Sequence, residues 1–304
     1  MTRLAALASF EKALAGKKIL VTGHTGFTGG WACRWLSEIG AIVAGFSLPP
    51  NTEPSLFKIL GLAKAVPTAF GDISEYDALY NAVREFGPHL ILHLAAQPLV
   101  RESYRDPVRT FHVNVQGTVH LLEVARHVKS VKAVLSVTTD KVYYNNESDD
   151  RLIPDFVRAM KNNASMMLRF PDATRPWQHV LALVQGHLMI LAGLISDDST
   201  RFARARNLGP LDNRPYSVRA FLEMMCKHWG SRPQLRYFEN PLPESRALAL
   251  DSSNARDLLG WRPVWDTERV IQETAKWYRD FYDDPSSAPG ITLDQINSWR
   301  AALK

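Results

Sequence analysis

The chain has 304 residues, 46% hydrophobic and 22% charged, a composition typical of a globular protein with one large domain or one domain and a small lobe. Its two cysteines, Cys33 and Cys226, indicate a reducing cytoplasm without a disulfide framework, and no Cys/His cluster has zinc-site spacing, so we expect no metal. The net charge of +5 suits an anionic ligand, whereas the absence of a basic run with interleaved aromatic residues argues against a nucleic-acid partner.

Neither of the two apolar segments of the chain has the pattern of a targeting or membrane signal. Charged residues interrupt residues 1–16, which predict a short helix before the first strand and not a signal peptide. The longest apolar stretch, Leu181–Ile195, is too short to cross a membrane and contains polar residues, so it predicts a buried helix and no membrane partner.

The first half of the chain alternates apolar strands with helical segments. This alternation predicts an α/β fold, a Rossmann-like, doubly wound parallel sheet that binds its ligand at the carboxyl ends of the strands. We assign it to residues 1–147. The expected strands are Lys18–Thr22, Ala41–Phe46, Ala65–Phe70, His89–Leu94 and Lys132–Val137, and the expected helices are Gly30–Ile39, Glu75–Phe86 and Thr110–Val128.

The second half, residues 148–304, has shorter elements and more prolines. It predicts a small substrate lobe, with some elements that return to the first domain. Its expected helices are Arg151–Lys161, Val180–Ile195, Val218–Trp229, Asn254–Leu259 and, as the last helix, Thr267–Tyr282, and its expected strand is Met166–Phe170.

Three glycines separate the first strand from the first helix with the spacing G-x-x-G-x-x-G. Gly23 allows a tight turn, Gly26 allows phosphates to approach the backbone, and Gly29 allows the helix to pack close to the strand. This arrangement favours a pyrophosphate site at the helix N-terminus, with an ordinary strand–helix turn as the alternative.

Several further motifs accompany this turn. They are TGHTGFTG at 22–29, GDI at 71–73, HLAAQPLVR at 93–101, NVQGT at 114–118, TDK at 139–141, DRLIPD at 150–155, RPWQHV at 175–180 and LGWRP at 259–263. Together they resemble the extended short-chain dehydrogenase/reductases and, within them, the CDP-glucose 4,6-dehydratases. The resemblance runs from Lys17 to about Tyr282.

The resemblance implies a cytoplasmic, NAD-dependent lyase of deoxysugar biosynthesis that converts CDP-glucose to CDP-4-keto-6-deoxyglucose. Hydride leaves C4 for NAD, water is lost across C5 and C6, and the hydride returns to C6. By position, Thr139 bonds the C4 hydroxyl, Asp140 is the acid for the C6 hydroxyl, and Lys141 serves the C5 step. Family members form homodimers through the long helix, here Thr110–Val128.

The resemblance also implies binding residues. Three have structural alternatives: Asp72 as a helix N-cap, Asn114 as a structural group, and Arg175 as the partner of a surface acid. The second strand ends at Ser47 with neither an acid nor an arginine, so NAD over NADP follows from the family alone. The implied cofactor residues are Gly23, Thr25, Gly26, Phe27, Gly29, Asp72, Ile73, Leu94, Ala95, Ala96 and Asn114, and the implied substrate residues are Gln97, Arg101, Arg175 and Gln178.

One family feature is absent. The superfamily base is a tyrosine with a lysine four residues later on one helix, and none of the nine tyrosines has such a lysine. The missing block, a helix and a strand with their loops, falls between Glu147 and Asp150 and comprises roughly 60 residues. Its loss should weaken the family's dimer interface, to which the absent helix contributes, and leave an unpaired sheet edge.

Three interpretations are compatible with this gap. In the first, the natural chain carries the block and the present sequence is a shortened form. In the second, the protein lacks the block and binds nucleotide sugars without normal catalysis. The third, a related NAD-dependent epimerase or reductase, is disfavoured by HLAAQPLVR and by Lys141.

Overall fold

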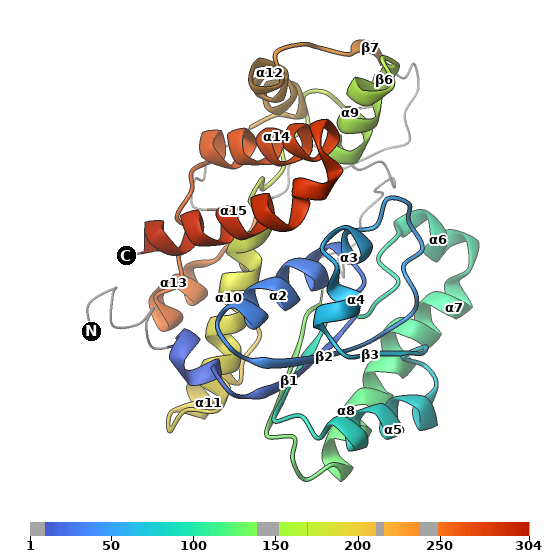
Figure 1. Cartoon of the computed structure of the whole chain (residues 1–304), viewed down its shortest axis with the longest axis vertical. Helices are drawn as coiled ribbons and strands as arrows, with labels where there is room; N and C mark the ends of the chain where they lie inside the picture. Colours follow the sequence, from blue (N-terminus) through green and yellow to red (C-terminus); the bar gives the residue numbers. More distant parts are fainter. Residues whose placement is uncertain (1–9, 139–151, 169, 211–215, 238–248, 304) are drawn as a thin grey trace.

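Five parallel strands form the central sheet of the computed structural model, which describes residues 10–138, 152–168, 170–210, 216–237 and 249–303. The strand order is β3-β2-β1-β4-β5 (Figure 1). This confirms the predicted α/β, doubly wound fold. The strands are β1 (Lys18–Thr22), β2 (Ile42–Ser47), β3 (Thr68–Phe70), β4 (Leu90–His93) and β5 (Ala133–Ser136).

Helices cover both faces of this sheet. Alternate side chains of β1 point to opposite faces, so Ile19 and Val21 belong to one apolar cluster and Leu20 to the other. The first face is covered by α2 (Phe27–Glu38) and α10 (Val180–Leu194), and the second by α5 (Tyr76–Phe86) and α8 (Gly117–His127).

The long helix predicted from Thr110 to Val128 starts earlier and is not uniform. It begins as α7 (Pro107–Phe111), passes through a π-helical turn, η1 (His112–Gln116), and continues as α8. Asp106 caps the start by accepting a hydrogen bond from Arg109 N at 2.8 Å, and a proline suits the first position because it lacks an N–H. Shorter helices, α3 (Leu56–Ile59), α4 (Leu62–Ala65) and α6 (Val100–Arg105), connect the strands.

The second half builds a lobe above the sheet in the view of Figure 1. Two strands, β6 (Ser165–Leu168) and β7 (Gln234–Tyr237), pair in parallel over a cluster that includes Phe156, Phe221 and Ile271. Besides α10, the helices of the second half are α9 (Leu152–Lys161), α11 (Ser199–Phe202), α12 (Val218–Trp229), α13 (Ser253–Leu259), α14 (Thr267–Asp283), the 3₁₀ turn η2 (Pro285–Ser287) and α15 (Ala288–Leu303). Of these, α11 and α13 lie beside α10 at the lower left of Figure 1 and not in the lobe.

The prediction that the helix starting at Thr267 is the last one was wrong. Helix α15 follows it and packs against α2, where Trp299 is fully buried. Its Arg300 donates two hydrogen bonds of 2.8 Å to the carboxylate of Glu11 in the helical turn at 10–14. Proline and glycine in its first turn hid this helix in the sequence, although proline is tolerated there. No helix in the described ranges is long and apolar enough to cross a membrane.

Four histidines lie buried within the described residues. Burial lowers the pKa of His24, His93 and His187 to about 4 and that of His179 to about 3, because the charged imidazolium is poorly solvated there. These side chains are therefore neutral in the native protein at neutral pH.

Acid should consequently destabilise the fold well above the pKa of these native histidines. Unfolded histidines bind protons below about pH 6.5 while the native ones stay neutral until about pH 4, so the free energy of unfolding falls as pH drops through this window, by up to about 1.4 kcal/mol per pH unit for each histidine. Urea unfolding at pH 7.5, 6 and 5 measures the slope. His187→Leu should make it shallower, and an unchanged slope would contradict this account.

Candidate functional site

The turn after β1 requires glycine at its first position. Gly23 has a φ of +71°, and a Cβ on it would lie 2.7 Å from Ala95 N and 2.8 Å from the carbonyl carbon of Leu94. Both the backbone conformation and the close approach of the β4 end therefore exclude a side chain.

The other two glycines of the motif have different surroundings. A Cβ on Gly29 would overlap the carbonyl of Gly23 and lie 2.6 Å from His24 Cα, so this glycine lets α2 pack onto the turn. Gly26 is exposed, and a Cβ on it would meet only Gly23 O, at 3.3 Å. Gly26 is therefore the position where a ligand can approach the backbone.

The N-terminus of α2 is open. Gly26 is its N-cap and offers no side chain, and the first turn contains no acidic residue. The first N–H groups of a helix have no intrahelical acceptor and carry a partial positive charge. These donors, at the end of a 12-residue helix, suit a phosphate group.

His93 joins β1, β4 and α8 where the sheet order reverses. Thr118 Oγ1 donates to Asn114 O at 2.7 Å, so it accepts from His93 Nε2 at 3.2 Å. His93 Nδ1 therefore accepts from Thr22 Oγ1 at 2.7 Å, because a neutral imidazole has one N–H. This chain of hydrogen bonds fixes the strand ends beside the glycine turn.

Asn114 holds the loop that follows β4. Its Oδ1 accepts from Gln97 N at 2.7 Å and its Nδ2 donates to Gln97 O at 3.0 Å. Because Asn114 sits in the π-helical turn η1, a local departure from the α-helix aims it at this loop. Gln97 bonds Leu99 and Thr110 with its own side chain. The structure thus places both residues beside Ala95 and Ala96, at the carboxyl end of β4.

The hydroxyl groups of Thr25 and Ser47 form a hydrogen bond at the end of β2. Thr25 Oγ1 donates to Leu48 O at 3.0 Å and lies 2.7 Å from Ser47 Oγ. Because the proton of Thr25 is already used, Ser47 is the donor in their mutual bond, and its own oxygen offers only lone pairs. Ser47 was not among the expected site residues, although its position at the end of the second strand marks where such folds contact a ribose.

The remaining expected cofactor residues lie around this edge. Phe27 is half exposed on the first turn of α2. Asp72 Oδ1 accepts from Ser74 N at 2.9 Å and from Ser74 Oγ at 2.7 Å, so part of this carboxylate stabilises its own turn. Ile73 is buried and fills the space beside Gly117, so only its backbone is available to a ligand.

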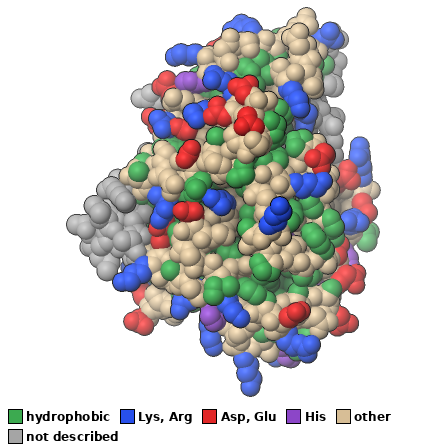
Figure 2. Space-filling model, in the orientation of Figure 1, with side chains coloured by type: hydrophobic (Ala, Val, Ile, Leu, Met, Phe, Trp, Pro, Cys, Tyr) green, Lys and Arg blue, Asp and Glu red, His purple; other side chains and the backbone are tan. Residues whose placement is uncertain are grey.

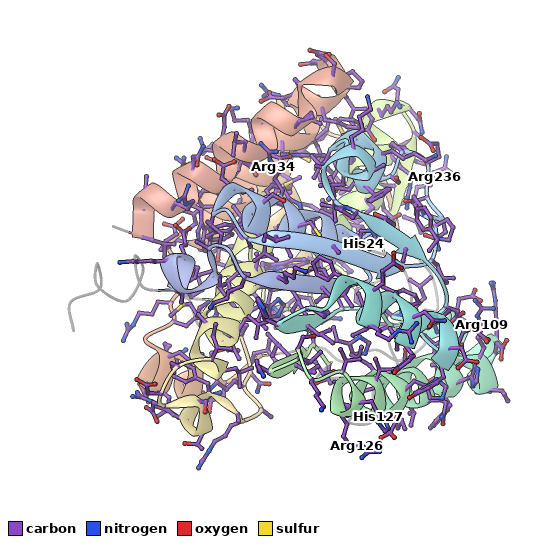
Figure 3. All side chains as sticks on the ribbon, turned by 60° about the horizontal axis from the view of Figure 1, so that its bottom comes forward. His24, Arg34, Arg109, Arg126, His127 and Arg236 are labelled. Carbon is purple, nitrogen blue, oxygen red and sulfur yellow. The ribbon has the colours of Figure 1, made fainter. Side chains whose placement is uncertain are left out.

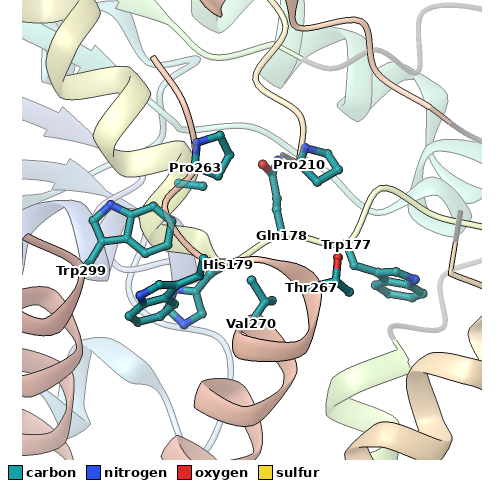
Figure 4. A pocket seen from close by; sticks show the side chains of 10 residues that line it. Trp177, Gln178, His179, Pro210, Pro263, Thr267, Val270 and Trp299 are labelled. Carbon is teal, nitrogen blue, oxygen red and sulfur yellow. The ribbon is translucent and has the colours of Figure 1, made fainter. Parts of the chain in front are cut away.

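The expected substrate residues of the second half, Arg175 and Gln178, lie in the segment that leads from the lobe into α10. Gln178 Nε2 donates to Leu208 O at 2.8 Å, and Arg175 Nη1 donates to Thr174 O at 2.8 Å. Figure 4 shows Gln178 pointing between Pro210 and Pro263 in a narrow hollow, whose other walls include Trp177, His179 and Trp299. This aromatic hollow contains none of the expected cofactor residues.

The expected catalytic residues Thr139, Asp140 and Lys141 lie outside the described residues, as does the side chain of Arg101. The strand that leads to the triplet is described: β5 ends at Ser136, and Val137 N donates to His93 O at 3.0 Å. Val137 therefore lies beside the carboxyl end of β4.

The described residues show neither a concentration of charge on the face of Figure 2 nor a cluster of metal ligands. His24 lies at the sheet, while Arg109 and Arg126 lie on the outer helices (Figure 3). Basic and acidic side chains are interspersed on the face shown in Figure 2. The described residues contain no group of three or more His, Cys, Asp or Glu side chains that could hold a metal ion.

Comparison with known proteins gives one family. Residues 20–150 match the sequence model of the GDP-mannose 4,6 dehydratase family. CDP-glucose 4,6-dehydratase of Salmonella typhimurium is 34% identical over 87% of this chain and 91% of its own length. UDP-glucuronate 4-epimerase 1 of Arabidopsis thaliana is 24% identical over 88% and 78%.

Comparison with solved structures shows that the chain has the fold of a nucleotide-sugar epimerase. UDP-glucose-4-epimerase from Stenotrophomonas maltophila, crystallised with NAD and formylated UDP-arabinopyranose, superposes with a TM-score of 0.74. The superposition covers 88% of this chain and 99% of that one, at 19% sequence identity.

The alignments also measure the gap. The alignment with the Salmonella protein spans 327 positions but uses 87% of 304 residues, about 264, so about 63 positions face no residue of this chain. The same comparison with the Arabidopsis protein, 336 positions and 88%, leaves about 68. These totals count every unmatched position along each alignment, and they are close to the roughly 60 residues predicted for the missing block.

Proposed function

Because the chain belongs to the nucleotide-sugar dehydratase family that includes CDP-glucose 4,6-dehydratase, we propose that it binds NAD and CDP-glucose and serves the dehydration of this sugar to CDP-4-keto-6-deoxyglucose. Such a reaction makes the protein a lyase. The observation that carries the proposal is the 34% identity to the Salmonella dehydratase over most of both chains. The open glycine turn provides an independent physical basis for the cofactor.

The residues present fit a dinucleotide. Gly23, Gly26 and Gly29 form a cradle that side chains would fill, and the uncapped start of α2 supplies N–H donors for the pyrophosphate. Bound NAD supplies a hydride acceptor and later a hydride donor. Asn114 and the His93 chain keep the β4 loop in place, so Leu94, Ala95 and Ala96 can line the cofactor.

The end of β2 favours NAD over NADP. Ser47 Oγ can accept a hydrogen bond from a ribose 2′-hydroxyl, which is a donor. A 2′-phosphate presents acceptors and negative charge, so it meets no matching donor from this hydroxyl pair. The preference arises here without the acidic residue that usually bonds the ribose.

The sugar would lie beyond the cofactor, toward Thr139, Asp140 and Lys141. In this proposal Gln97, Arg101, Arg175 and Gln178 bind the nucleotide part, and the triplet holds the C4 hydroxyl, protonates the leaving C6 hydroxyl and moves the C5 proton. The tyrosine and lysine that take the C4 proton belong to the missing block. The chain alone should therefore bind both ligands and turn over slowly.

A binding protein without normal catalysis is the second candidate function. The specific observation in its favour is the gap of about 63 positions against the Salmonella dehydratase. The two candidates share the cofactor site and differ in turnover.

Two glycine variants test the cofactor cradle. Gly26→Val should abolish NAD binding in calorimetry while the thermal unfolding temperature stays near that of the parent, because its side chain points to the ligand position. Gly29→Ala, the matched control, should instead lower stability by about 1–3 kcal/mol, because its Cβ overlaps the Gly23 carbonyl. Unchanged NAD affinity in Gly26→Val would reject the cradle.

The hydroxyl pair predicts a change in cofactor preference. Ser47→Ala should weaken NAD binding about 2- to 13-fold, the worth of one hydrogen bond, and leave NADP binding unchanged. Thr25→Ser keeps the hydroxyl and should keep the parent's ratio of dissociation constants. A Ser47→Ala ratio equal to that of the parent would contradict the assignment.

Turnover tests the consequence of the missing tyrosine and lysine. With CDP-glucose and NAD, the chain of 34.2 kDa, verified by intact mass, should form 4-keto-6-deoxy product at least about 10²–10⁴-fold more slowly than the Salmonella enzyme, because the base is absent. Chromatography measures the product. A rate equal to that of the Salmonella enzyme would show that another group replaces the tyrosine. A mass clearly above 34.2 kDa for the natural protein would show that the natural chain contains the block.

A further inference from the structure

Helix α2 lacks the local features that usually stabilise a helix. Its N-cap, Gly26, offers no side-chain oxygen, its first turn contains no acidic residue and its last turn contains no basic one. Gly29 and Gly30 lie close to its start, and glycine is a poor helix former. A helix that is left open for a ligand in this way depends on tertiary contacts to hold its position.

One carboxylate joins the far end of α2 to two other elements. Glu11, in the helical turn at 10–14, accepts a hydrogen bond of 2.9 Å from Trp35 Nε1 of α2. The same carboxylate accepts two bonds of 2.8 Å from Nε and Nη2 of Arg300, near the end of α15. Trp35 is fully buried, and the side chains of Glu11 and Arg300 are only 20% and 32% exposed. We call Glu11, Trp35 and Arg300 the α2 brace.

The geometry of the α2 brace is specific to its residue types. Arg300 uses two nitrogens of its planar fork on the two oxygens of Glu11, a bidentate pairing that the single ammonium of a lysine cannot reproduce. The hydrogen bonds to Glu11 raise the pKa of Arg300, and the charge of Glu38, the last residue of α2, adds to this effect. Two acids, one of them on α2, therefore hold the guanidinium in place.

Helix α15 is itself firmly anchored, so it can serve as a support. Trp299 Nε1 donates to Gln185 Oε1 of α10 at 3.1 Å, and Gln295 Nε2 donates to Glu273 O of α14 at 2.7 Å. All four of these residues are buried. Helix α15 lies beside α2 and contacts it directly (Figure 1). The α2 brace thus ties α2 to the packed second half of the chain.

Helix α2 transmits this constraint to the glycine turn. Phe27 begins the helix, and Trp35 follows eight residues later, about 12 Å along the axis. Between them, the ring of Trp31 packs against those of His179 and Trp277, with centroids 5.6 and 6.5 Å apart. Hydrogen bonds to a phosphate weaken when the donors move by a few tenths of an ångström. A small change in the direction of α2 would therefore misplace the N–H groups at its start.

We propose that Glu11, Trp35 and Arg300 are positioning residues for the cofactor: the α2 brace fixes the direction of α2 and so aims its N-terminal N–H groups at the pyrophosphate of NAD. This rests on the proposed function, which places NAD at the glycine turn. Because coupling between two sites is reciprocal, NAD bound at the start of α2 also stabilises the docking of α15 at its end.

Two variants remove the ion pair from its two sides. Glu11→Gln and Arg300→Met should each weaken NAD binding in calorimetry at least about fivefold, the lower end of usual coupling between sites. The double variant should bind NAD no more weakly than the weaker single variant, because both changes remove the same interaction. Arg300→Lys keeps the charge without the fork and should give an intermediate affinity.

The matched control loses packing elsewhere. Met225 is fully buried in the apolar cluster of the lobe, so Met225→Ala should lower the unfolding temperature and leave NAD affinity at the parent's value.

Amide hydrogen exchange provides a readout that a purely structural contact would not change. Without NAD, Glu11→Gln should speed exchange in residues 30–38 of α2 and leave α8 unchanged. Adding NAD to the parent chain should slow exchange in α15, which contains none of the expected cofactor residues.

Three results would overturn the proposal. One is a parent chain that binds NAD while Glu11→Gln and Arg300→Met bind it equally well. Another is an equal loss of affinity in Met225→Ala, because the effect would then follow general stability. The third is exchange in α15 that NAD leaves unchanged. These failures differ from that of the proposed function, because a parent chain that does not bind NAD would reject both.

Discussion

The close approach of β1 and β4 at their carboxyl ends is the constraint on which the site depends. Gly23 can lie against Ala95 only because it has no side chain, and the neutral His93 bonds Thr22 on one side and Thr118 on the other. The same contact keeps the strand order that reverses between β1 and β4. The glycine turn that would hold the cofactor and the position of the loop after β4 both depend on this contact between the two strand ends.

From the sequence, the junction could be predicted and its finer chemistry could not. The glycine spacing identifies the turn because Gly23 and Gly29 stand where a Cβ would overlap neighbouring backbone atoms. Ser47 was overlooked because its role depends on the direction of a shared proton, which only the distances to Thr25 and Leu48 reveal. Likewise, the Gln97 side chain donates hydrogen bonds to Leu99 O and to Thr110 Oγ1 of α7, contacts that motif spacing does not describe.

The lobe was less predictable than the sheet for a physical reason. Sheet strands are buried on both faces and therefore read as apolar runs, whereas β7 is exposed along its whole length and has no such pattern. Helix α15 begins with Ala288, Pro289 and Gly290, residues that resemble a loop although the first turn of a helix accepts proline. Tertiary contacts with α2, through Trp299 above all, decide its conformation.

The fold accommodates the gap because the two faces of β5 are supported unequally. On one face α10 packs against β4 and β5, and its residues join the large cluster that contains Leu90 and Leu92. This core is complete without the missing block, so the sheet retains a stabilised face. On the other face, among the described residues, α8 packs against α5 and β5, and its Val119 and Leu122 are half exposed. Among the described residues, the α10 side of the sheet is therefore well packed, while apolar side chains stay exposed on the outer side of α8.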